Sequence, residues 1–523
     1  MTTVSNRRKV LGGLVGIGGL ANSAAATLAA THRTLPRAKT NSGLVEGNTE
    51  NGIYGFKGIP YGADTRLTRF QPPVPAKTWR GVRKAIAYGP ASPQGSNEPN
   101  QSENCLFLNV WTPALRDGGR RPVMFYIHGG AYSNGSGSAA IYDGTNLCKR
   151  GNVVVVTINH RLNAFGYLSL GMLDDRYADS GNVGQLDIIL ALNWVKENIA
   201  EFGGDPNCVM VFGQSGGGAK IATMMAMPGA KGLFHRAVSM SGQQITASGP
   251  LNARKRAEVY LKALGVAKID DLKTLDTAKL VAALGATDPV IGSGGVYFGP
   301  VLDFKNLTRH PFYPDAPAQS AAIPMMIGNT HDETRAFISD PGVYKLSWEE
   351  LPERLARNLR VDILPSFVID QYKAWYTGIS PTDLFFLATT AGRSWRAAIV
   401  EDELRAAAGT PAFAYQLDFP CPDDKRRAMH TTDIPLAFDN TDKEGAVTGN
   451  GEAARKMAAI LSETFIAFAR TGRPDNALIP TWTPYSLAGR ETMVFDLPPH
   501  LENDPRGRER KLFEKVPFIQ QGT

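Results

Sequence analysis

Short, strongly apolar runs alternate with a helical pattern along the first half of the chain. Residues 106–111, 122–127 and 153–158 have the length and composition of strands. The last of these contains four consecutive valines, as expected for a strand buried on both faces. Between 187 and 202, apolar residues recur at helical spacing, and 209–212 is again typical of a strand. The alternation predicts an α/β fold with a mostly parallel, doubly wound sheet.

The second half of the chain combines further strand patterns with long helical segments. The predicted strands are 237–242, 324–328 and 412–417, the predicted helical insertions over one end of the sheet are 250–285 and 345–410, and the predicted final helix is 453–470. Nothing marks an independent second domain, so we expect one catalytic domain over 43–523 after a polar linker at 31–42. Residues 44–47 and 52–56 predict a short hairpin.

The first 30 residues have the order of an export signal. The basic stretch Arg7-Arg8-Lys9 precedes a mildly apolar, glycine-rich run and then three small residues, 24–26. The paired arginines resemble a twin-arginine signal, which predicts a periplasmic or secreted protein. The apolar run is too short to cross a bilayer comfortably, and no later stretch is typical of a membrane span.

Composition excludes several classes of protein. Of 523 residues, 43% are hydrophobic and 20% charged, as in a soluble globular protein with a large core. The net charge of +7 is spread without long basic runs, which argues against nucleic-acid binding. The four cysteines are Cys105, Cys148, Cys208 and Cys421. They include no Cys-x-x-Cys pair, so their spacing matches neither a zinc site nor a disulfide scaffold.

A Gly-x-Ser-x-Gly motif joins the 209–212 strand to a segment that favours a helix, 221–227. In this arrangement Gly213 and Gly217 flank a turn that is too tight for side chains and leaves the hydroxyl of Ser215 exposed. The pattern therefore predicts a nucleophile elbow. The alternative is a glycine-rich turn with a solvated serine.

A serine hydroxyl needs a base and an orienting carboxylate to act as a nucleophile. In sites built on such an elbow the acid and then the histidine follow the serine in the chain. The loop at 328–333 offers Asp332 and Glu333 as acids, and spacing alone does not separate them. Beyond this loop are His430, in a polar loop after a predicted strand, and His500, in a charged tail typical of a solvated surface. We therefore expect His430 to be the base.

Glycines at a second strand end indicate where an oxyanion would bind. His128-Gly129-Gly130 follows the 122–127 strand, where glycine lets backbone N–H groups approach a developing negative charge. The N–H of Gly216, at the start of the helix after the serine, is the expected third donor. The alternative for the Gly-Gly pair is an ordinary turn.

Together these motifs resemble the type-B carboxylesterases, a family of the α/β-hydrolase fold that includes para-nitrobenzyl esterases and cholinesterases. The resemblance runs from about residue 40 to the C-terminus, and its other matching stretches are 56–62, 69–75, 102–110, 159–162 and 202–206. It implies Ser215 as nucleophile, Glu333 as acid and His430 as base, with Gly129, Gly130 and Gly216 as the oxyanion hole. The family usually has glutamate at Glu333, which decides against Asp332.

The resemblance implies a serine carboxylic-ester hydrolase that acts on small esters through an acyl-enzyme, with no metal or organic cofactor. Two other functions share the fold. One is a lipase acting at lipid interfaces, and the other is a non-catalytic binding module. Such modules typically lack a member of the triad, whereas all three residues are present here.

Four positions depart from the family pattern. The family commonly has glutamate at Gln214 and alanine at Gly216. Loss of the carboxylate at 214 argues against cationic substrates and favours neutral or anionic esters. Ser92 stands where the family has a cysteine, which leaves Cys105 without its usual disulfide partner, and Thr431 replaces a glycine after the histidine.

Overall fold

The computed structural model describes residues 35–520 and Gly522. Residues 35–523 cluster into one compact unit. The predicted export signal and the first part of the predicted linker lie outside the described residues.

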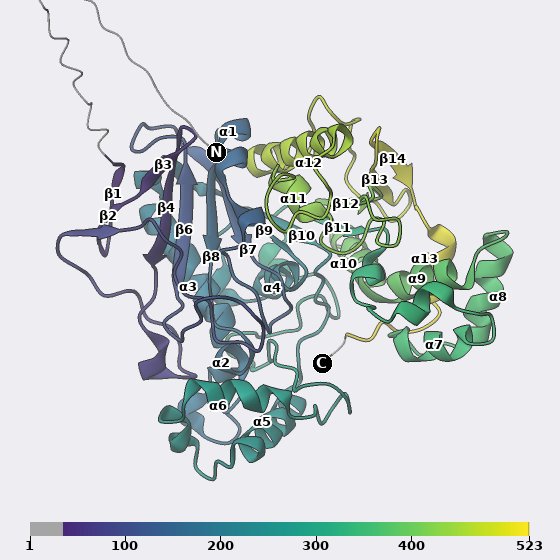
Figure 1. Cartoon of the computed structure of the whole chain (residues 1–523), viewed down its shortest axis with the longest axis horizontal. Coiled ribbons are helices and arrows are strands. Elements are labelled where there is room, and N and C mark those ends of the chain that lie inside the picture. The colour runs from purple at the N-terminus through teal and green to yellow at the C-terminus, as the bar shows by residue number, and fades with distance from the viewer. Residues whose placement is uncertain (1–34, 521, 523) are drawn as a thin grey trace, which may run out of the picture. The chain divides into compact units, whose positions relative to one another are not determined.

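An eleven-stranded sheet runs through this unit (Figure 1). Its order is β14 (His500–Asn503), β13 (Glu491–Phe495), β12 (Ala412–Leu417), β11 (Met325–Thr330), β10 (Arg236–Met240), β9 (Gly204–Gln214), β7 (Arg121–Ile127), β8 (Val154–Ile158), β6 (Phe107–Thr112), β4 (Ile53–Pro60) and β3 (Asn48–Glu50). Neighbours from β8 to β13 pair in parallel, and the edge strands pair antiparallel. This confirms the predicted α/β-hydrolase architecture with a mostly parallel sheet.

The N-terminal strands correct two predictions. The linker predicted at 31–42 contains a strand, β1 (Arg37–Thr40), which pairs with β2 (Gly43–Glu46). Its side chains alternate between exposed and buried, a pattern too short to stand out in the sequence. The first arm of the predicted hairpin is β3 rather than 44–47, because β2 belongs to a separate small sheet with β1 and β5 (Val82–Lys84).

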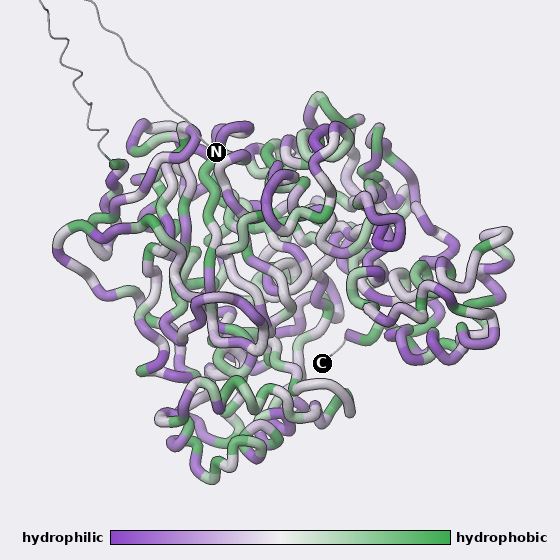
Figure 2. The backbone as a smooth tube through the Cα atoms, viewed as in Figure 1, coloured by the Kyte–Doolittle hydropathy of each residue, from purple (hydrophilic) through white to green (hydrophobic). Residues whose placement is uncertain are grey.

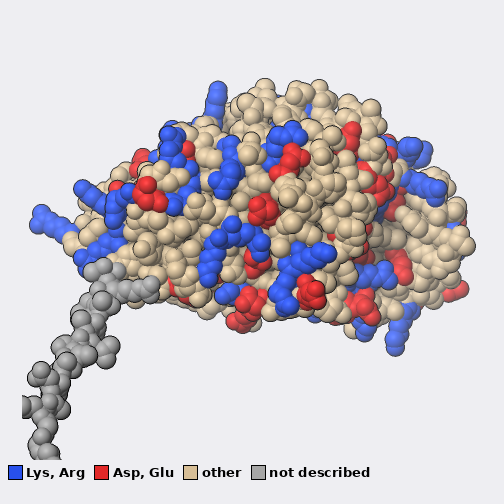
Figure 3. Space-filling view, turned by 90° about the horizontal axis from the view of Figure 1, so that it is seen from above, with Lys and Arg blue, Asp and Glu red and all other residues tan. Residues whose placement is uncertain are grey.

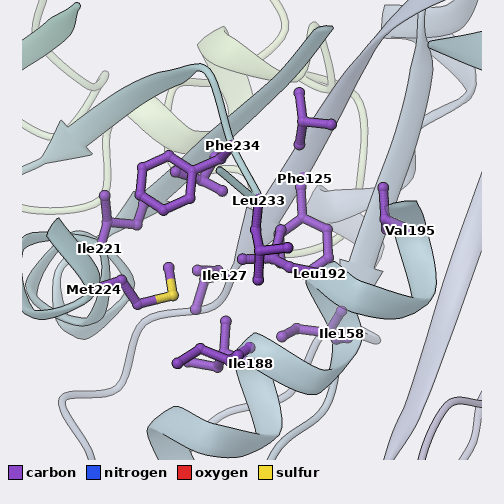
Figure 4. Close-up of a cluster of buried hydrophobic side chains, with 14 of the residues drawn as sticks. Phe125, Ile127, Ile158, Ile188, Leu192, Val195, Ile221, Met224, Leu233 and Phe234 are labelled. Atoms are coloured by element: carbon purple, nitrogen blue, oxygen red, sulfur yellow. The ribbon is translucent and has the colours of Figure 1, made fainter. Parts of the chain in front are cut away.

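The strands are apolar throughout because both faces of the sheet are covered. On one face, Phe125 and Ile127 of β7 pack with α3 (Val183–Asn198) and α4 (Gly216–Met225) (Figure 4). On the other face, Met124 and Tyr126 belong to a second core that includes residues of α12 (Glu452–Thr471). Alternate residues of one strand therefore serve two cores.

Both predicted insertions are helical. The remaining helices are α1 (Thr145–Gly151), α2 (Asn163–Tyr167), α5 (Pro250–Leu264), α6 (Thr277–Ala282), α7 (Leu351–Asn358), α8 (Pro365–Trp375), α9 (Pro381–Thr390), α10 (Arg396–Ala407), α11 (Asp433–Ala437) and α13 (Gly507–Phe513). Helices α7, α8 and α9 share a hydrophobic core with the end of α13. The tube in Figure 2 alternates between hydrophilic and hydrophobic colours along them, as expected for helices with one buried face.

The surface and the cysteines agree with a globular protein. Lys and Arg side chains are interspersed with Asp and Glu on the face shown in Figure 3. Among the described helices, none has the length and apolar character needed to cross a bilayer. All four cysteines carry free thiols. Burial raises the pKa of the Cys105 thiol, and Ser92 lies beside it in place of a disulfide partner.

Candidate active site

The predicted site residues meet at one edge of the sheet. Gly129 and Gly130 follow β7, Ser215 follows β9, Glu333 follows β11, and His430 lies in the loop after β12. These strands are parallel, so their carboxyl ends share the edge where α/β proteins bind ligands.

The turn at Ser215 has the backbone of a nucleophile elbow. Ser215 has φ 56° and ψ −125°, and α4 begins at the next residue. A Cβ on Gly217 would lie 2.0 Å from the carbonyl oxygen of Ile127, and one on Gly213 would lie 2.7 Å from the carbonyl carbon of Gly217. The helix therefore approaches β7 so closely that only glycine fits at these positions.

Glu333 and His430 form a buried pair. The Nδ1–H of His430 donates to Oε2 of Glu333, and the backbone N–H of Thr330 donates to Oε1 at 2.9 Å. Burial of Glu333 raises its pKa, but the charge and hydrogen bond of His430 outweigh this effect and hold the pKa below its usual value. Glu333 is therefore an ionised carboxylate that orients the imidazole.

The two rival residues lie elsewhere. Asp332 accepts from Arg335 Nε at 3.2 Å and contacts Nδ1 of His331 at 3.1 Å, so its carboxylate is engaged away from His430. His500 is exposed on β14. The structure therefore places Glu333, and neither Asp332 nor His500, in the pair with the predicted base His430.

Thr431 has a backbone conformation that glycine ordinarily favours. Its φ is 80°, in the left-handed region that a β-branched residue rarely adopts. The loop that delivers His430 therefore has the glycine-like turn despite the substitution, at a cost in local strain.

The side chain of Gln214 forms a hydrogen bond with the ring nitrogen of His430 that faces away from Glu333. With Nδ1–H donated to Glu333, the lone pair of His430 lies on Nε2, and the side-chain amide of Gln214 donates to it at 3.0 Å. Within the described part of the chain, Ser215 Oγ makes no hydrogen bond. The structure therefore brings Glu333 and His430 together, but Gln214 and not Ser215 binds the imidazole.

The three predicted oxyanion glycines have available N–H groups. None of the N–H groups of Gly129, Gly130 and Gly216 donates to another atom of residues 35–520. Gly129 adjoins the elbow, since a Cβ on it would lie 3.3 Å from Cβ of Ser215. Gly130 has φ 81°, and its Cβ would lie 2.2 Å from the carbonyl oxygen of Asn134. Glycine is required at both positions.

A buried lysine holds the loop that carries these glycines. Lys220 of α4 donates to the carbonyl oxygens of Ala131 at 2.7 Å and His128 at 3.2 Å, and its ammonium lies over the ring of Tyr132. The carbonyl oxygen of Ala131 lies only 2.0 Å from where a Cβ on Gly216 would be. The usual alanine would therefore not fit at Gly216 in this arrangement.

A pocket of about 180 Å³ opens at Ser215. Besides Ser215 and Gly216, it is lined by Ala131, Tyr132, Ala219, Ser241, Gly242, Gln243, Gln244, Tyr297, Arg360, Arg393, Ser394, Ala397, Phe518, Ile519 and Gln520. Arg360 follows α7 and Arg393 lies between α9 and α10, so the second helical insertion supplies both. No cluster of His, Cys, Asp and Glu suited to a metal ion occurs among the residues described.

Sequence reasoning missed three basic residues of the site. Lys220 had a signal, because it interrupts a run of small and apolar residues in the helix after the elbow. Arg360 and Arg393 had none, since the insertion that carries them contains many charged residues and their positions depend on how its helices pack.

The fold and the residues at the carboxyl edge define an α/β-hydrolase. The sequence model of the carboxylesterase family matches residues 34–513, so the chain belongs to that family. The para-nitrobenzyl esterase of Bacillus subtilis (strain 168) is 34% identical over 505 residues, covering 91% of this chain and 98% of the relative. Phenmedipham hydrolase of Pseudarthrobacter oxydans is 33% identical over 486 residues, covering 86% and 92%.

The solved structures agree. Carboxylesterase EST55 of Geobacillus stearothermophilus has a TM-score of 0.82 and 37% identity, covering 92% of this chain and 100% of its own. With the relatives above, this makes the protein a carboxylic ester hydrolase.

Replacing Gly217 by alanine should disrupt the elbow. The added Cβ would meet the Ile127 carbonyl, which cannot move away without moving β7. We therefore expect the free energy of unfolding to fall by about 1–3 kcal/mol or more, and ester hydrolysis to be lost. Gly229→Ala is the matched control, because a Cβ there meets only Ile189 Cδ1 at 3.6 Å. Urea unfolding of both variants checks this, and equal stabilities would contradict the close approach.

Lys220 should make stability depend on pH. Burial lowers its pKa from 10.5 to about 7, so the unfolded chain binds a proton that the folded chain releases between these values. The free energy of unfolding therefore rises with pH across this window, and Lys220→Met removes the rise. We expect the free energy of unfolding of the unaltered protein, measured relative to that of Lys220→Met, to rise by about 3 kcal/mol between about pH 7 and pH 10.

Urea unfolding at several pH values measures this gain. Exposed Lys255→Met is the control and should preserve the slope. If the difference in free energy of unfolding between the unaltered protein and Lys220→Met were the same at every pH, Lys220 would not titrate in this range.

Proposed function

We propose that this carboxylesterase hydrolyses small neutral or anionic esters through a Ser215–His430–Glu333 triad and an acyl-enzyme intermediate. The observation that carries the proposal is the buried Glu333–His430 pair at the sheet edge where Ser215 stands on its elbow. This pair supplies a base with a fixed tautomer, which a serine hydroxyl requires.

In the proposed mechanism, Ser215 attacks the ester carbonyl while Nε2 of His430 takes its proton. The negative charge that develops on the carbonyl oxygen is received by the free N–H groups of the three glycines 129, 130 and 216. The imidazolium returns the proton to the departing alcohol. A water molecule, deprotonated by His430, then releases the acid and restores Ser215.

The hydrogen bond from Gln214 to His430 must break before the first step. Its amide occupies the Nε2 lone pair of His430, which has to accept the proton of Ser215. A rotation of the Gln214 side chain frees this lone pair. The hydrogen bond observed here therefore belongs to a resting arrangement, in keeping with catalytic hydrogen bonds that form only with substrate bound.

The alternatives find less support. A non-catalytic binding module would have no use for a complete triad. A pocket of about 180 Å³ is small beside ordinary ligand sites and suits a compact ester better than a long-chain lipid. The predicted export signal at residues 1–30 supports action in the periplasm or outside the cell, and this location stays a prediction.

Ser215→Ala should abolish covalent labelling by a fluorophosphonate probe while the fold is preserved. The probe reacts with an activated serine, and the elbow at Ser215 supports this residue as its target. Exposed Ser133→Ala is the matched control and should label like the unaltered protein. Full labelling of Ser215→Ala would assign the nucleophile to another serine, such as Ser241 in the same pocket.

Gln214→Glu should move the acidic limb of the pH–rate profile to higher pH. A carboxylate at this position cannot donate to Nε2, and its charge favours the imidazolium form of His430, which cannot accept a proton from Ser215. We expect a shift on the order of one pH unit in kcat/KM for a neutral ester. Gln214→Met, which removes the hydrogen bond without adding charge, should give no upward shift. If the pH–rate profiles of Gln214→Glu and Gln214→Met coincided, the placement of residue 214 beside Nε2 of His430 would be contradicted.

A further inference from the structure

Two arginines without an acidic partner line the pocket at Ser215. Arg360 and Arg393 are both partly buried. Within the described residues, neither side chain makes a hydrogen bond or an ion pair. None of the described residues that line the pocket is an aspartate or a glutamate. The site of ester hydrolysis therefore holds two cations whose charge is balanced by none of these lining residues.

This arrangement differs from that of four buried arginines elsewhere in the described part of the chain, each of which is paired with a carboxylate. The pairs are Arg69 with Glu103, Arg161 with Asp187, Arg256 with Asp288, and Arg506 with Glu509. Burying a guanidinium is costly unless a carboxylate accepts its hydrogen bonds, and in these pairs the chain supplies one. At the pocket it does not.

Arg393 is held in place by contacts that leave its hydrogen-bond donors free. Its guanidinium lies 4.0 Å from the ring centroid of Phe337, whose ring packs against that of His430 at 4.6 Å. The helix is interrupted at this point, because 391–395 forms a π-turn in which Arg393 leaves the helical conformation. Such turns are frequent at functional sites. Here the turn brings both Arg393 and Ser394 to the pocket.

The positive charges of Arg360 and Arg393 also repel each other. Burial, and then the charge of Arg360, lowers the pKa of Arg393 to about 9, so it is still a cation at neutral pH. Burial lowers the pKa of Arg360 as well. The charge of Glu333 acts favourably on Arg393, but that carboxylate is fully buried and bonded to His430. An anion between the arginines would relieve both the repulsion and the unmet hydrogen bonds.

We propose that the enzyme selects esters that carry a free carboxylate, such as monoesters of dicarboxylic acids, and that Arg360 and Arg393 bind this carboxylate while the ester carbonyl meets Ser215. The inference rests on the proposed function. Water cleaves the acyl–oxygen bond, and the products are a dicarboxylate and an alcohol. Guanidinium groups suit this role because their planar donors match the two oxygens of a carboxylate.

The first test compares monomethyl esters of succinate, glutarate and adipate with neutral isosteres in which a carbamoyl group replaces the free carboxylate. Hydrolysis is followed by the acid that it releases. We expect kcat/KM to be at least about tenfold higher for the carboxylate form at the best chain length. Arg360→Met and Arg393→Met should each lower this ratio by about tenfold, and added salt should lower it in the unaltered protein. Arg357→Met is the matched control, because Arg357 is exposed on α7 and paired with Glu353, and it should preserve the ratio.

The second test is independent of turnover. Calorimetry of Ser215→Ala with succinate, glutarate and adipate should show binding that Arg360→Met and Arg393→Met each weaken by about tenfold. Arginine-dependent binding without ester hydrolysis in the unaltered protein would refute the proposed function and keep the anion site. Ester hydrolysis without a carboxylate preference, or without dicarboxylate binding, would overturn the inference and leave the proposed function standing.

Discussion

The close approach of the first turn of α4 to the end of β7 is the constraint on which the site depends. Ile127 and Gly217 touch through backbone atoms alone, because no side chain fits between them. This contact fixes the angle between β9 and α4, and with it the strained backbone of Ser215 and the free N–H of Gly216. The two cores on either side of the sheet hold the strands that make the approach possible.

The electrostatic environment follows from what is buried behind this turn. Glu333 is ionised because His430 offsets the effect of its burial, so the imidazole is oriented before substrate arrives. Lys220 draws the loop after β7 against α4 through two carbonyl groups. Arg360 and Arg393 line the pocket. The developing negative charge and the carboxylate of the proposed substrate would therefore both meet a site of positive potential.

Much of this could be predicted from the sequence, because the relevant signals are local. Apolar runs such as 153–158 marked the strands, and the glycines around Ser215 marked the elbow. Residues 37–40 were misassigned because two buried positions make too weak a pattern. The choice of Glu333 over Asp332 needed the family resemblance, since both lie in one loop and only the folded chain turns one of them toward His430.

The remaining features depend on contacts between distant segments. Gln214 was singled out as a missing charge, but its hydrogen bond to His430 joins residues 216 positions apart and has no signature in either segment. Arg360 and Arg393 reach the pocket through the packing of one insertion and a π-turn within it. Sequence periodicity predicts that such a segment is helical and does not predict which of its cations faces the nucleophile.

Direct observation of the acyl-enzyme tests the central claim most directly. A neutral activated ester is mixed with the protein, the reaction is quenched with acid before turnover is complete, and the peptides are analysed by mass spectrometry. The account predicts an acyl group on the peptide that contains Ser215, at the hydroxyl of that residue. An acyl group on another side chain, or turnover with no covalent intermediate under conditions where deacylation is slow, would contradict it.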